Sequence, residues 1–247
     1  MDKALYISMS GAMQTMLAQS ANSNNLANAG TTGFRAQMVQ SQPVAVDGAG
    51  FGSRVNSQLL DQGWDSTQGD LNPTGRDLDV ALRPSYWLAV QAPDGTEAYT
   101  RAGNLSVNAN GQLITGNGQQ VLGDAGPLSV PAYSSIKVGD DGTISIVPAG
   151  QNPNTVAAVG RLKVVQADQA QIARGSDGLM HPLQPDTPLD SASGTVLTSG
   201  KLEGSNVDIA NTMVTMIQLA RQFDLQSQLM KTVQTDASAA STLVQMS

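Results

Sequence analysis

The side chains that most often carry out catalysis or bind metals are scarce in this sequence, and none of them completes a known pattern. His181 is the only histidine, and residues 179–182 around it supply no acid or nucleophile that would make it a catalytic base. Asp140 and Asp141 precede Gly142, but this segment has too few oxygen ligands for a calcium loop, and a hairpin turn explains it. We therefore predict no catalytic residue, no metal site and no bound cofactor.

Two further kinds of residue could bind a ligand, and a structural role explains both of them better. Residues 48–52 and 116–118 are rich in glycine but do not complete a dinucleotide-binding motif between a strand and a helix. Tyr86 and Trp87 lie in a strand pattern, where aromatic side chains belong to a core more often than to a sugar-binding platform. A peptidoglycan-binding β protein that uses these two residues is a second hypothesis, and a hydrolase is a remote third.

Composition limits the class of protein and its partners. The 247 residues include 13 Lys and Arg against 20 Asp and Glu, which gives a net charge of −7, and only 13% of them are charged. Phosphate binding depends on clustered basic residues, so we expect no nucleic acid as a partner. The sequence has no run of about 18 apolar residues and no pattern of a cleaved signal peptide, so we predict that this is not an integral membrane protein. The absence of cysteine excludes disulfide bonds and thiolate chemistry.

Apolar residues recur at helical spacing near both ends of the chain. In the first segment, from about residue 3 to 27, the stripe includes Leu5, Met9, Met13 and Met16, and the residues from Asn28 to Gly33 end the helix. A second helix is predicted from about 209 to 246, roughly 55 Å long, with Asn206 or Asp208 as its N-cap. Its near-heptad stripe includes Met213, Met216, Ala220, Phe223, Met230 and Val233.

Between these two helices the hydrophobic period changes to two, and turn residues recur. Strands are predicted at 78–82, 87–90, 105–107, 112–115, 136–138, 143–147 and 161–167. We interpret residues 76–180 as a central, mainly antiparallel β domain. The flanking segments 34–75 and 181–206 are rich in Gly, Ser, Asn, Gln and Asp, and we expect them to be extended connectors.

Two amphipathic helices at opposite ends of one chain need a surface that buries their apolar stripes. Each stripe presents large side chains that stabilise by about 1.5–3 kcal/mol apiece when buried. One solution is that residues 1–33 and 207–247 pack together as a coiled coil, and the other is that both helices fold onto the β domain. We choose the first, so the predicted fold is mixed α and β, with long terminal helices packed as a coiled coil and a central antiparallel β domain. A two-stranded coil leaves apolar surface uncovered, so we expect copies of the chain or related chains to cover the rest.

Asparagines cluster near the end of the first helix, where they are poor helix formers. Asn24 and Asn28 are four residues apart and lie on one face, and Asn25 is next to them. These side chains could bond across a subunit contact and set its register. Fraying and C-capping of the helix is the alternative, and from the residues alone it is the better explanation.

The segment 23–36, SNNLANAGTTGFRA, resembles the N-terminal signature of bacterial flagellar rod and hook proteins, in which an NNLAN stretch precedes a GF pair and a basic residue. Residues 76–82, 94–103 and 110–113 are similar to the central domain of that family. Residues 202–208 followed by 213–217, which include Ile217, are similar to its C-terminal signature. The resemblance covers nearly the whole chain and is closest to the proximal rod members, with the distal rod members as the alternative.

This resemblance implies a structural subunit without enzymatic activity. Members of the family are exported through the flagellar type III apparatus without a cleaved signal peptide, and they polymerise helically into the periplasmic rod of the basal body, the shaft that transmits torque. The expected partners are further copies of the chain, other proximal and distal rod subunits and the export apparatus. The terminal helices are expected to form the inner tube and to be disordered in the free monomer. The resemblance also implies that Asn24, Asn25, Asn28, Gly33 and Phe34 set the bend and register after the first helix.

Overall fold

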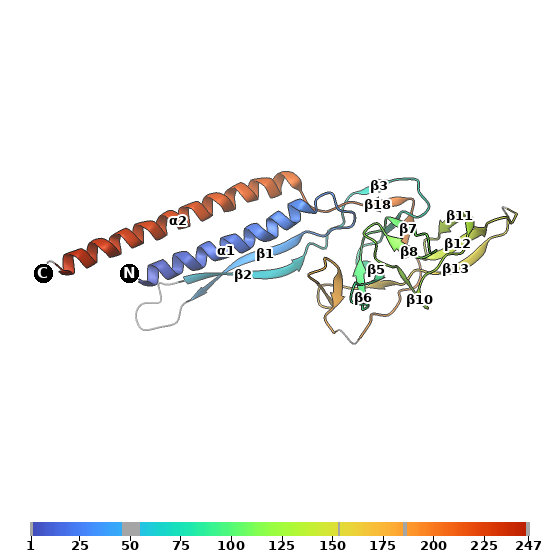
Figure 1. The fold of residues 1–247 in the computed structure, drawn as a ribbon, viewed down its shortest axis with the longest axis horizontal. Coiled ribbons are helices and arrows are strands. Elements are labelled where there is room, and N and C mark those ends of the chain that lie inside the picture. The colour runs from blue at the N-terminus through green and yellow to red at the C-terminus, as the bar shows by residue number, and fades with distance from the viewer. Residues whose placement is uncertain (1, 46–54, 153, 185–186, 246–247) are drawn as a thin grey trace. The chain divides into compact units, whose positions relative to one another are not determined.

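The computed structural model of this chain describes residues 2–45, 55–152, 154–184 and 187–245, which belong to two compact units (Figure 1). The helical unit comprises Met1–Ala29, Gln37–Gly63 and Val207–Ser247. The β unit comprises Gly30–Ala36 and Trp64–Asn206.

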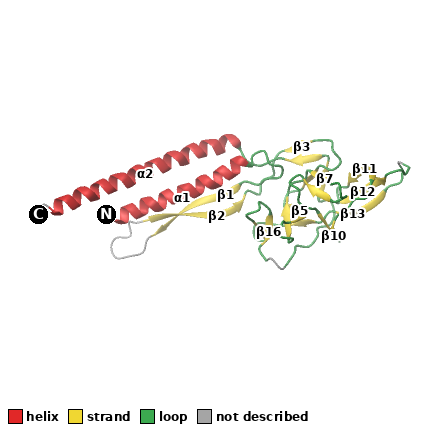
Figure 2. Ribbon diagram, in the orientation of Figure 1, coloured by secondary structure: helices red, strands yellow, loops and turns green. Residues whose placement is uncertain are grey.

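The helical unit consists of two helices and one β-hairpin. Helix α1 spans Asp2–Ala27 and helix α2 spans Ile209–Gln245, as the helical spacing predicts. Strands β1 (Gln37–Ala45) and β2 (Val55–Trp64) form a two-stranded sheet. Helix α1 contacts both α2 and β1, so its inner surface is divided between two neighbours (Figure 2).

The predicted coiled coil is wrong. Leu5, Met9, Met13 and Met16, which the prediction placed in the seam, are 40%, 52%, 61% and 58% exposed. The buried residues of α1 among those described are instead Ala12, Thr15 and Asn25. A coiled coil needs large apolar side chains from both helices at its seam, whereas α1 directs small and polar side chains inward and large ones outward. The prediction of a mixed α and β protein with a mainly antiparallel centre is consistent with the structure.

The segment 34–75, expected to be an extended connector, includes the strands β1 and β2. Its glutamines and serines conceal the alternation that sequence analysis relies on, but Val39 and Leu59 are half-buried in β1 and β2. The backbone N–H of Leu59 donates to the Gln14 side chain of α1 at 2.8 Å, which ties the hairpin to the helix. The hairpin thus depends on α1, a partner that its own residues do not reveal.

Helix α2 begins at a defined cap. The carboxylate of Asp208 accepts hydrogen bonds from the backbone N–H groups of Ala210 at 2.9 Å and Asn211 at 3.2 Å, so the cap is Asp208 and not Asn206. At about 1.5 Å per residue, α2 is longer than α1 by about 16 Å. Its C-terminal turns therefore extend past the start of its antiparallel neighbour (Figure 1).

The β unit is a set of small antiparallel sheets. The largest has the strand order β14-β5-β6-β16-β15, and a second has the order β11-β12-β13. The remaining pairs are β3 with β18, β4 with β17, β7 with β8, and β9 with β10. The strands of the two larger sheets are β5 (Tyr86–Gln91), β6 (Glu97–Thr100), β14 (Val164–Gln166), β15 (Ile172–Arg174), β16 (Met180–Pro182), β11 (Tyr133–Val138), β12 (Thr143–Pro148) and β13 (Ala157–Arg161). The paired strands are β3 (Leu71–Pro73), β18 (Lys201–Glu203), β4 (Val80–Leu82), β17 (Leu197–Ser199), β7 (Leu105–Val107), β8 (Leu113–Thr115), β9 (Leu122–Gly123) and β10 (Gly126–Pro127).

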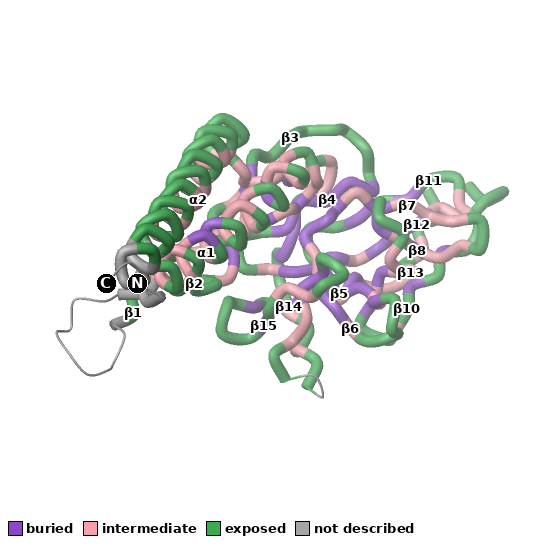
Figure 3. Tube along the Cα trace, turned by 60° about the vertical axis from the view of Figure 1, so that its left-hand side comes forward, coloured by how far each residue is buried: buried purple, intermediate pink, exposed green. Residues whose placement is uncertain are grey.

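Apolar residues of these strands form two buried clusters. The larger contains Val80, Leu88, Leu105 and Ile144, each fully buried, and the smaller surrounds the rings of Trp87 and Tyr99. Figure 3 shows the buried residues concentrated in the strands of this unit, whereas α2 is exposed along most of its length. The β unit thus has a closed core of its own.

Two turns of the β unit share the sequence Asp-Gly-Thr. The Asp94 carboxylate accepts from the Thr96 hydroxyl at 2.6 Å and its backbone N–H at 2.9 Å, and these bonds lower the pKa of Asp94. The Asp141 carboxylate accepts from the backbone N–H and the hydroxyl of Thr143 at 3.0 and 2.7 Å, which lowers the pKa of Asp141. The motif at residues 140–142 is therefore the predicted hairpin turn, with its carboxylate engaged by Thr143.

Candidate assembly interface

Large apolar side chains follow the outer face of α1. Met9, Met13 and Met16 succeed one another at steps of four and three residues, and they are 52–61% exposed. Tyr6 and Leu17, at 63% and 46% exposed, widen this stripe. The predicted interface residues of α1 thus lie together on one face, and within the described chain that face is open.

The predicted interface residues of α2 divide between two faces. Met216, Phe223, Met230 and Val233 are half-buried, and their spacing of seven and three residues places them on the side toward α1. The other three members, Met213, Ile217 and Ala220, are exposed, Met213 to 50% and Ile217 to 55%. The outward face also carries residues that the prediction did not include, of which Leu225 at 61% and Leu229 at 56% are the most exposed.

Polar groups connect the two helices. The Thr15 hydroxyl donates to the side-chain oxygen of Gln226 at 3.1 Å, and the Asn22 amide donates to the backbone oxygen of Thr212 at 2.9 Å. Gly11 allows this approach, because a Cβ atom there would lie 2.9 Å from the side-chain nitrogen of Gln226. These contacts set an antiparallel register between α1 and α2, while Met9, Met13 and Met16 of α1 remain exposed on the outside.

The asparagine cluster serves several local roles. Asn25 is buried, and its amide exchanges two hydrogen bonds with the backbone of Gln37, donating at 2.9 Å and accepting at 2.8 Å. Asn28 donates from its side chain to the backbone oxygen of Asn24 at 2.9 Å, which is the C-capping that the residues alone favoured. Asn24 itself is exposed. Of the three, it is the one whose side chain faces an open groove.

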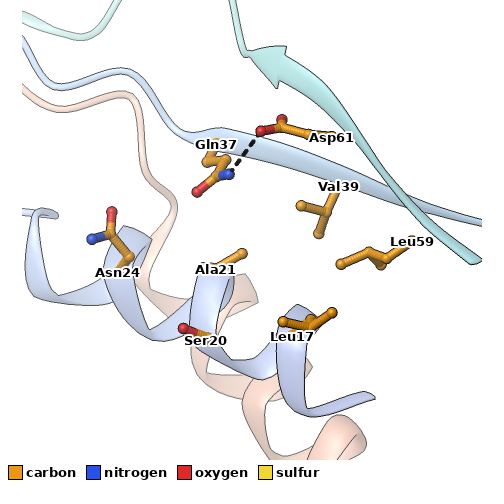
Figure 4. Close-up of a pocket in the computed structure, with 8 residues that line it drawn as sticks. All are labelled: Leu17, Ser20, Ala21, Asn24, Gln37, Val39, Leu59 and Asp61. Atoms are coloured by element: carbon orange, nitrogen blue, oxygen red, sulfur yellow. Dashed lines mark hydrogen bonds between the residues drawn. The ribbon is translucent and has the colours of Figure 1, made fainter. Parts of the chain in front are cut away.

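This groove lies between α1 and the hairpin of the helical unit (Figure 4). Its volume is about 340 Å³. Its lining residues come from α1 (Leu17, Ser20, Ala21 and Asn24), β1 (Gln37 and Val39) and β2 (Leu59 and Asp61). The groove thus combines an apolar floor with amide groups and one carboxylate.

The segment that follows α1 and the segment that precedes α2 are bonded to each other within the β unit. Gly33 donates from its backbone to the oxygen of Glu203 at 2.8 Å, and Asn206 donates to the oxygen of Phe34 at 3.2 Å. Gly33 has a φ of +70°, and a Cβ atom there would lie 2.3 Å from the backbone oxygen of Arg101. The predicted residues Gly33, Phe34 and Asn206 thus come together, and glycine is required at the first of them.

Asn206 and Phe34 are also held by their side chains. The Asn206 side-chain oxygen accepts from the backbone of Ala36 at 2.7 Å, and its amide donates to the backbone oxygen of Asp65 at 3.1 Å. The Arg174 guanidinium stacks over the Phe34 ring, with its central carbon 4.6 Å from the ring centroid. These contacts join chain segments that are remote in the sequence.

A buried charge cluster lies beside this junction. Glu203 is 1% exposed, and its carboxylate contacts the Arg35 guanidinium at 2.6 Å and the Nε atom of Arg101 at 3.0 Å. Arg101 also donates to the backbone oxygens of Leu82, Arg83 and Tyr86, whereas Nη1 of Arg35 has no hydrogen-bond partner among the described residues. Burial and the neighbouring Arg101 lower the pKa of Arg35 to about 10, although Glu203 opposes this shift. One carboxylate therefore pairs with two guanidinium groups, which leaves these three side chains with a net positive charge.

The sequence does not single out Arg101 or Glu203, and it presents Arg35 only as the basic residue after the GF pair. Their side chains are far apart in the sequence, so spacing alone gives no sign that they meet. The only indirect sign of their importance is that Arg35, Arg101 and Glu203 each lie in one of the signature segments quoted above. Charged residues are few in this chain, at 13%.

Trp87 and His181, the residues with potential chemistry, lie in surroundings that indicate a structural role. Trp87 is 4% exposed, and its indole N–H donates to the backbone oxygen of Ala167 at 3.3 Å, so its ring belongs to the core. The His181 ring lies 3.0 Å from the Asp177 carboxylate, and both are partly exposed. No group of three or more potential metal ligands occurs among the described residues. In the described part of the chain, neither helix is long and apolar enough to cross a membrane.

Three family models match successive parts of the chain. "Flagella basal body rod protein" matches residues 5–35, "Flagellar hook protein FlgE/F/G D1 domain" matches 83–146, and "Flagellar basal body rod FlgEFG protein C-terminal" matches 198–243. The first match contains the outer stripe of α1 and Arg35, the second contains Arg101, and the third contains Glu203 and most of α2.

Curated relatives match over the full length. The flagellar basal-body rod protein FlgF of Salmonella typhimurium is 42% identical over 252 residues, and FlgF of Escherichia coli is 43% identical over 253 residues, with 100% of both chains covered in each case. The flagellar basal-body rod protein FlgG of Bacillus subtilis is 31% identical over 255 residues, covering 93% of this chain and 94% of the relative.

Proposed function

The chain belongs to the flagellar basal-body rod protein family, and from this premise we propose how it acts within the rod. It is a structural subunit of the rod, located in the flagellar basal body, and it assembles with other components of that structure. Full-length identity to two FlgF proteins, above that to FlgG of Bacillus subtilis, supports a position in the proximal rod. The role is mechanical and involves no catalysis.

One observation carries this proposal: the exposed apolar side chains are concentrated on the helices. Eighteen large apolar side chains are exposed among the described residues, and twelve of them lie on α1 and α2, whereas three lie in the β unit. Contiguous apolar surface of this kind marks an interaction site. The two helices therefore polymerise with neighbouring subunits, while the β unit, which has its own core, forms the outer part.

The predicted interface residues have two roles in this mechanism. Met9, Met13 and Ile217, with the other exposed members of the two stripes, contact neighbouring subunits. Gly33, Phe34 and Asn206 hold the segments next to the helices at a fixed bend, and the ion cluster beside them resists deformation when torque passes through the chain. Export through the flagellar type III apparatus fits the absence of disulfide bonds in a chain with no cysteine.

The test is incorporation into basal bodies. A chain that lacks residues 210–247 should fail to enter purified basal bodies, while the full-length chain with the same tag should enter them. Both tryptophans, Trp64 and Trp87, lie in the β unit, so their fluorescence shows whether that unit of the truncated chain is still folded. A truncated chain that assembled as well as the full-length chain would show that α2 is not the polymerising element.

A further inference from the structure

The groove of the helical unit has an acidic group, Asp61, among its lining residues. The Asp61 carboxylate accepts from the Gln37 side chain at 3.2 Å (Figure 4). It also accepts from the backbone N–H of Gly63 at 2.9 Å, and both donors are neutral. No ion pair of Asp61 occurs among the described residues. Helix α1 cannot supply a cation beside the groove, because residues 5–34 contain no charged side chain.

The apolar side chains on the floor of the groove are also only partly covered. Leu17 is 46% exposed, and Val39 and Leu59 are half-buried. Together with Ala21 they surround an apolar hollow whose rim carries Asp61. A partner segment that fits this groove would carry an apolar side chain of moderate size about one helical turn from a cation.

The outward face of α2 offers this combination. Met213, Ile217, Arg221, Leu225 and Leu229 follow one another at intervals of four residues, and rows with this spacing form the ridges that helices pack into grooves. The four apolar members are 50–61% exposed. Arg221 is exposed and makes no hydrogen bond or ion pair with the described residues, so its charge is also available.

The ridge and the groove of one chain are both open. Leu225 is 61% exposed and Leu17 is 46% exposed, so neither surface covers the other within the chain. The side of α2 that is half-buried, with Met216 and Phe223, is a different face. An occupant of the groove that comes from α2 must therefore come from another copy.

We propose that the groove between α1 and the β1–β2 hairpin binds the α2 ridge of a second copy of this chain, with Arg221 paired to Asp61 and with Ile217 and Leu225 on the apolar floor. This inference rests on the proposed assembly through the helices, and it names the contact. Groove and ridge are different surfaces, so the contact is heterologous and each added copy presents a free groove or ridge to the next. Repetition of such a contact builds an open helical filament.

Disulfide cross-linking tests the contact directly, because the chain has no cysteine of its own. One tagged copy carries Leu59→Cys, a second copy with a different tag carries Leu225→Cys, and both replace the natural copy in the bacterium. After mild oxidation, basal bodies should contain a disulfide-linked dimer that carries both tags, and neither variant alone should form one. Val156→Cys, at an exposed position of the β unit, is the control partner that should not link to Leu59→Cys.

A charge exchange gives an independent readout. Asp61→Arg and Arg221→Asp should each lower incorporation about tenfold, as expected for like charges facing each other across an interface. The double variant should recover most of the loss, which a merely structural role of either residue would not produce. The matched control is Lys231→Asp, because Lys231 lies on another row of α2 and its reversal should be tolerated.

The outcomes separate this contact from the proposed function. If the natural chain is absent from basal bodies, the proposed function itself fails. If it is present, but no two-tag dimer forms and the charge exchange gives no recovery, the ridge-and-groove contact is overturned while the rod function stands. A link from Leu59→Cys to a cysteine placed in a different rod protein, with none to a second copy, would also overturn the proposal by identifying another occupant.

Discussion

Replacing Glu203 by glutamine should destabilise the β unit strongly. Its carboxylate is 1% exposed and faces two guanidinium groups, and it also accepts from the backbone N–H of Gly69 at 3.2 Å. Glutamine keeps the size of the side chain but removes the negative charge and turns an amide toward a cation. Removing one partner of a buried ion pair costs about 3–5 kcal/mol, and here both Arg35 and Arg101 lose their counter-ion. We therefore expect a loss of stability at the upper end of that range.

The two arginines should respond differently. Arg35→Met leaves Glu203 paired with Arg101 and removes the guanidinium whose Nη1 has no partner, so its cost should be below about 2 kcal/mol. Arg101→Met should cost more, because it also leaves the backbone oxygens of Leu82, Arg83 and Tyr86 without their donor. The expected order of destabilisation places Glu203→Gln and Arg101→Met well above Arg35→Met.

Urea unfolding followed by tryptophan fluorescence measures this order, since both tryptophans report on the β unit. Glu97→Gln is the matched control, because Glu97 pairs with Lys163 at 2.8 Å in the same unit but is 18% exposed. Its loss should be about 1 kcal/mol. If Arg35→Met cost as much as Glu203→Gln, or if Glu203→Gln unfolded at the same urea midpoint as the natural chain, the account of one carboxylate paired with two buried guanidinium groups would be refuted.

Three further predictions concern Gly33, Tyr99 and the exposed stripe of α1. Gly33→Ala should cost more than about 1 kcal/mol, since it strains a positive φ and brings a Cβ against the Arg101 backbone oxygen; the urea midpoint measures this loss. Burial raises the pKa of Tyr99, so this tyrosine ionises in the unfolded chain before it ionises in the folded one as the pH rises. The free energy of unfolding should therefore be unaffected by this group below about pH 10 and should fall above it. The fall should be weaker in Tyr99→Phe, and an equal dependence of stability on pH in both chains would contradict the role of Tyr99. Met9→Ser with Met13→Ser should change stability by less than about 0.5 kcal/mol per site but reduce incorporation into basal bodies, whereas Val156→Ser should leave incorporation unchanged.

The sequence predicted the helices well and their packing poorly, for a physical reason. Periodicity shows that Leu5, Met9 and Met13 share a face, but it does not show which neighbour covers that face. The assumption that large apolar residues face the other helix failed, because Ala12 and Thr15 occupy that position in α1. Under the proposed assembly, this exposed apolar face of α1 is the one that other chains cover.

The ion cluster could not be predicted for a different reason. Charged residues are rarely buried unless they are paired, and a pairing between Arg35, Arg101 and Glu203 depends on how distant segments meet. The turn at residues 140–142, by contrast, is predicted from three adjacent residues, since the hydrogen bonds that Asp141 accepts come from Thr143, two residues away. The prediction succeeded where the determining contacts are near in the sequence and failed where they are distant.

The two units should unfold separately, with the helical unit first. Its buried residues among those described are only Ala12, Thr15 and Asn25, whereas the β unit buries two apolar clusters. Regions with few buried apolar contacts open at lower free energy.

Far-ultraviolet circular dichroism at 222 nm follows the helical unit, since both helices lie there, and tryptophan fluorescence follows the β unit. In urea the dichroism should be lost before the fluorescence changes, and addition of assembled neighbours should stabilise only the helical transition. Coincident transitions in the free monomer would show that the two units unfold together and would contradict a less stable helical unit.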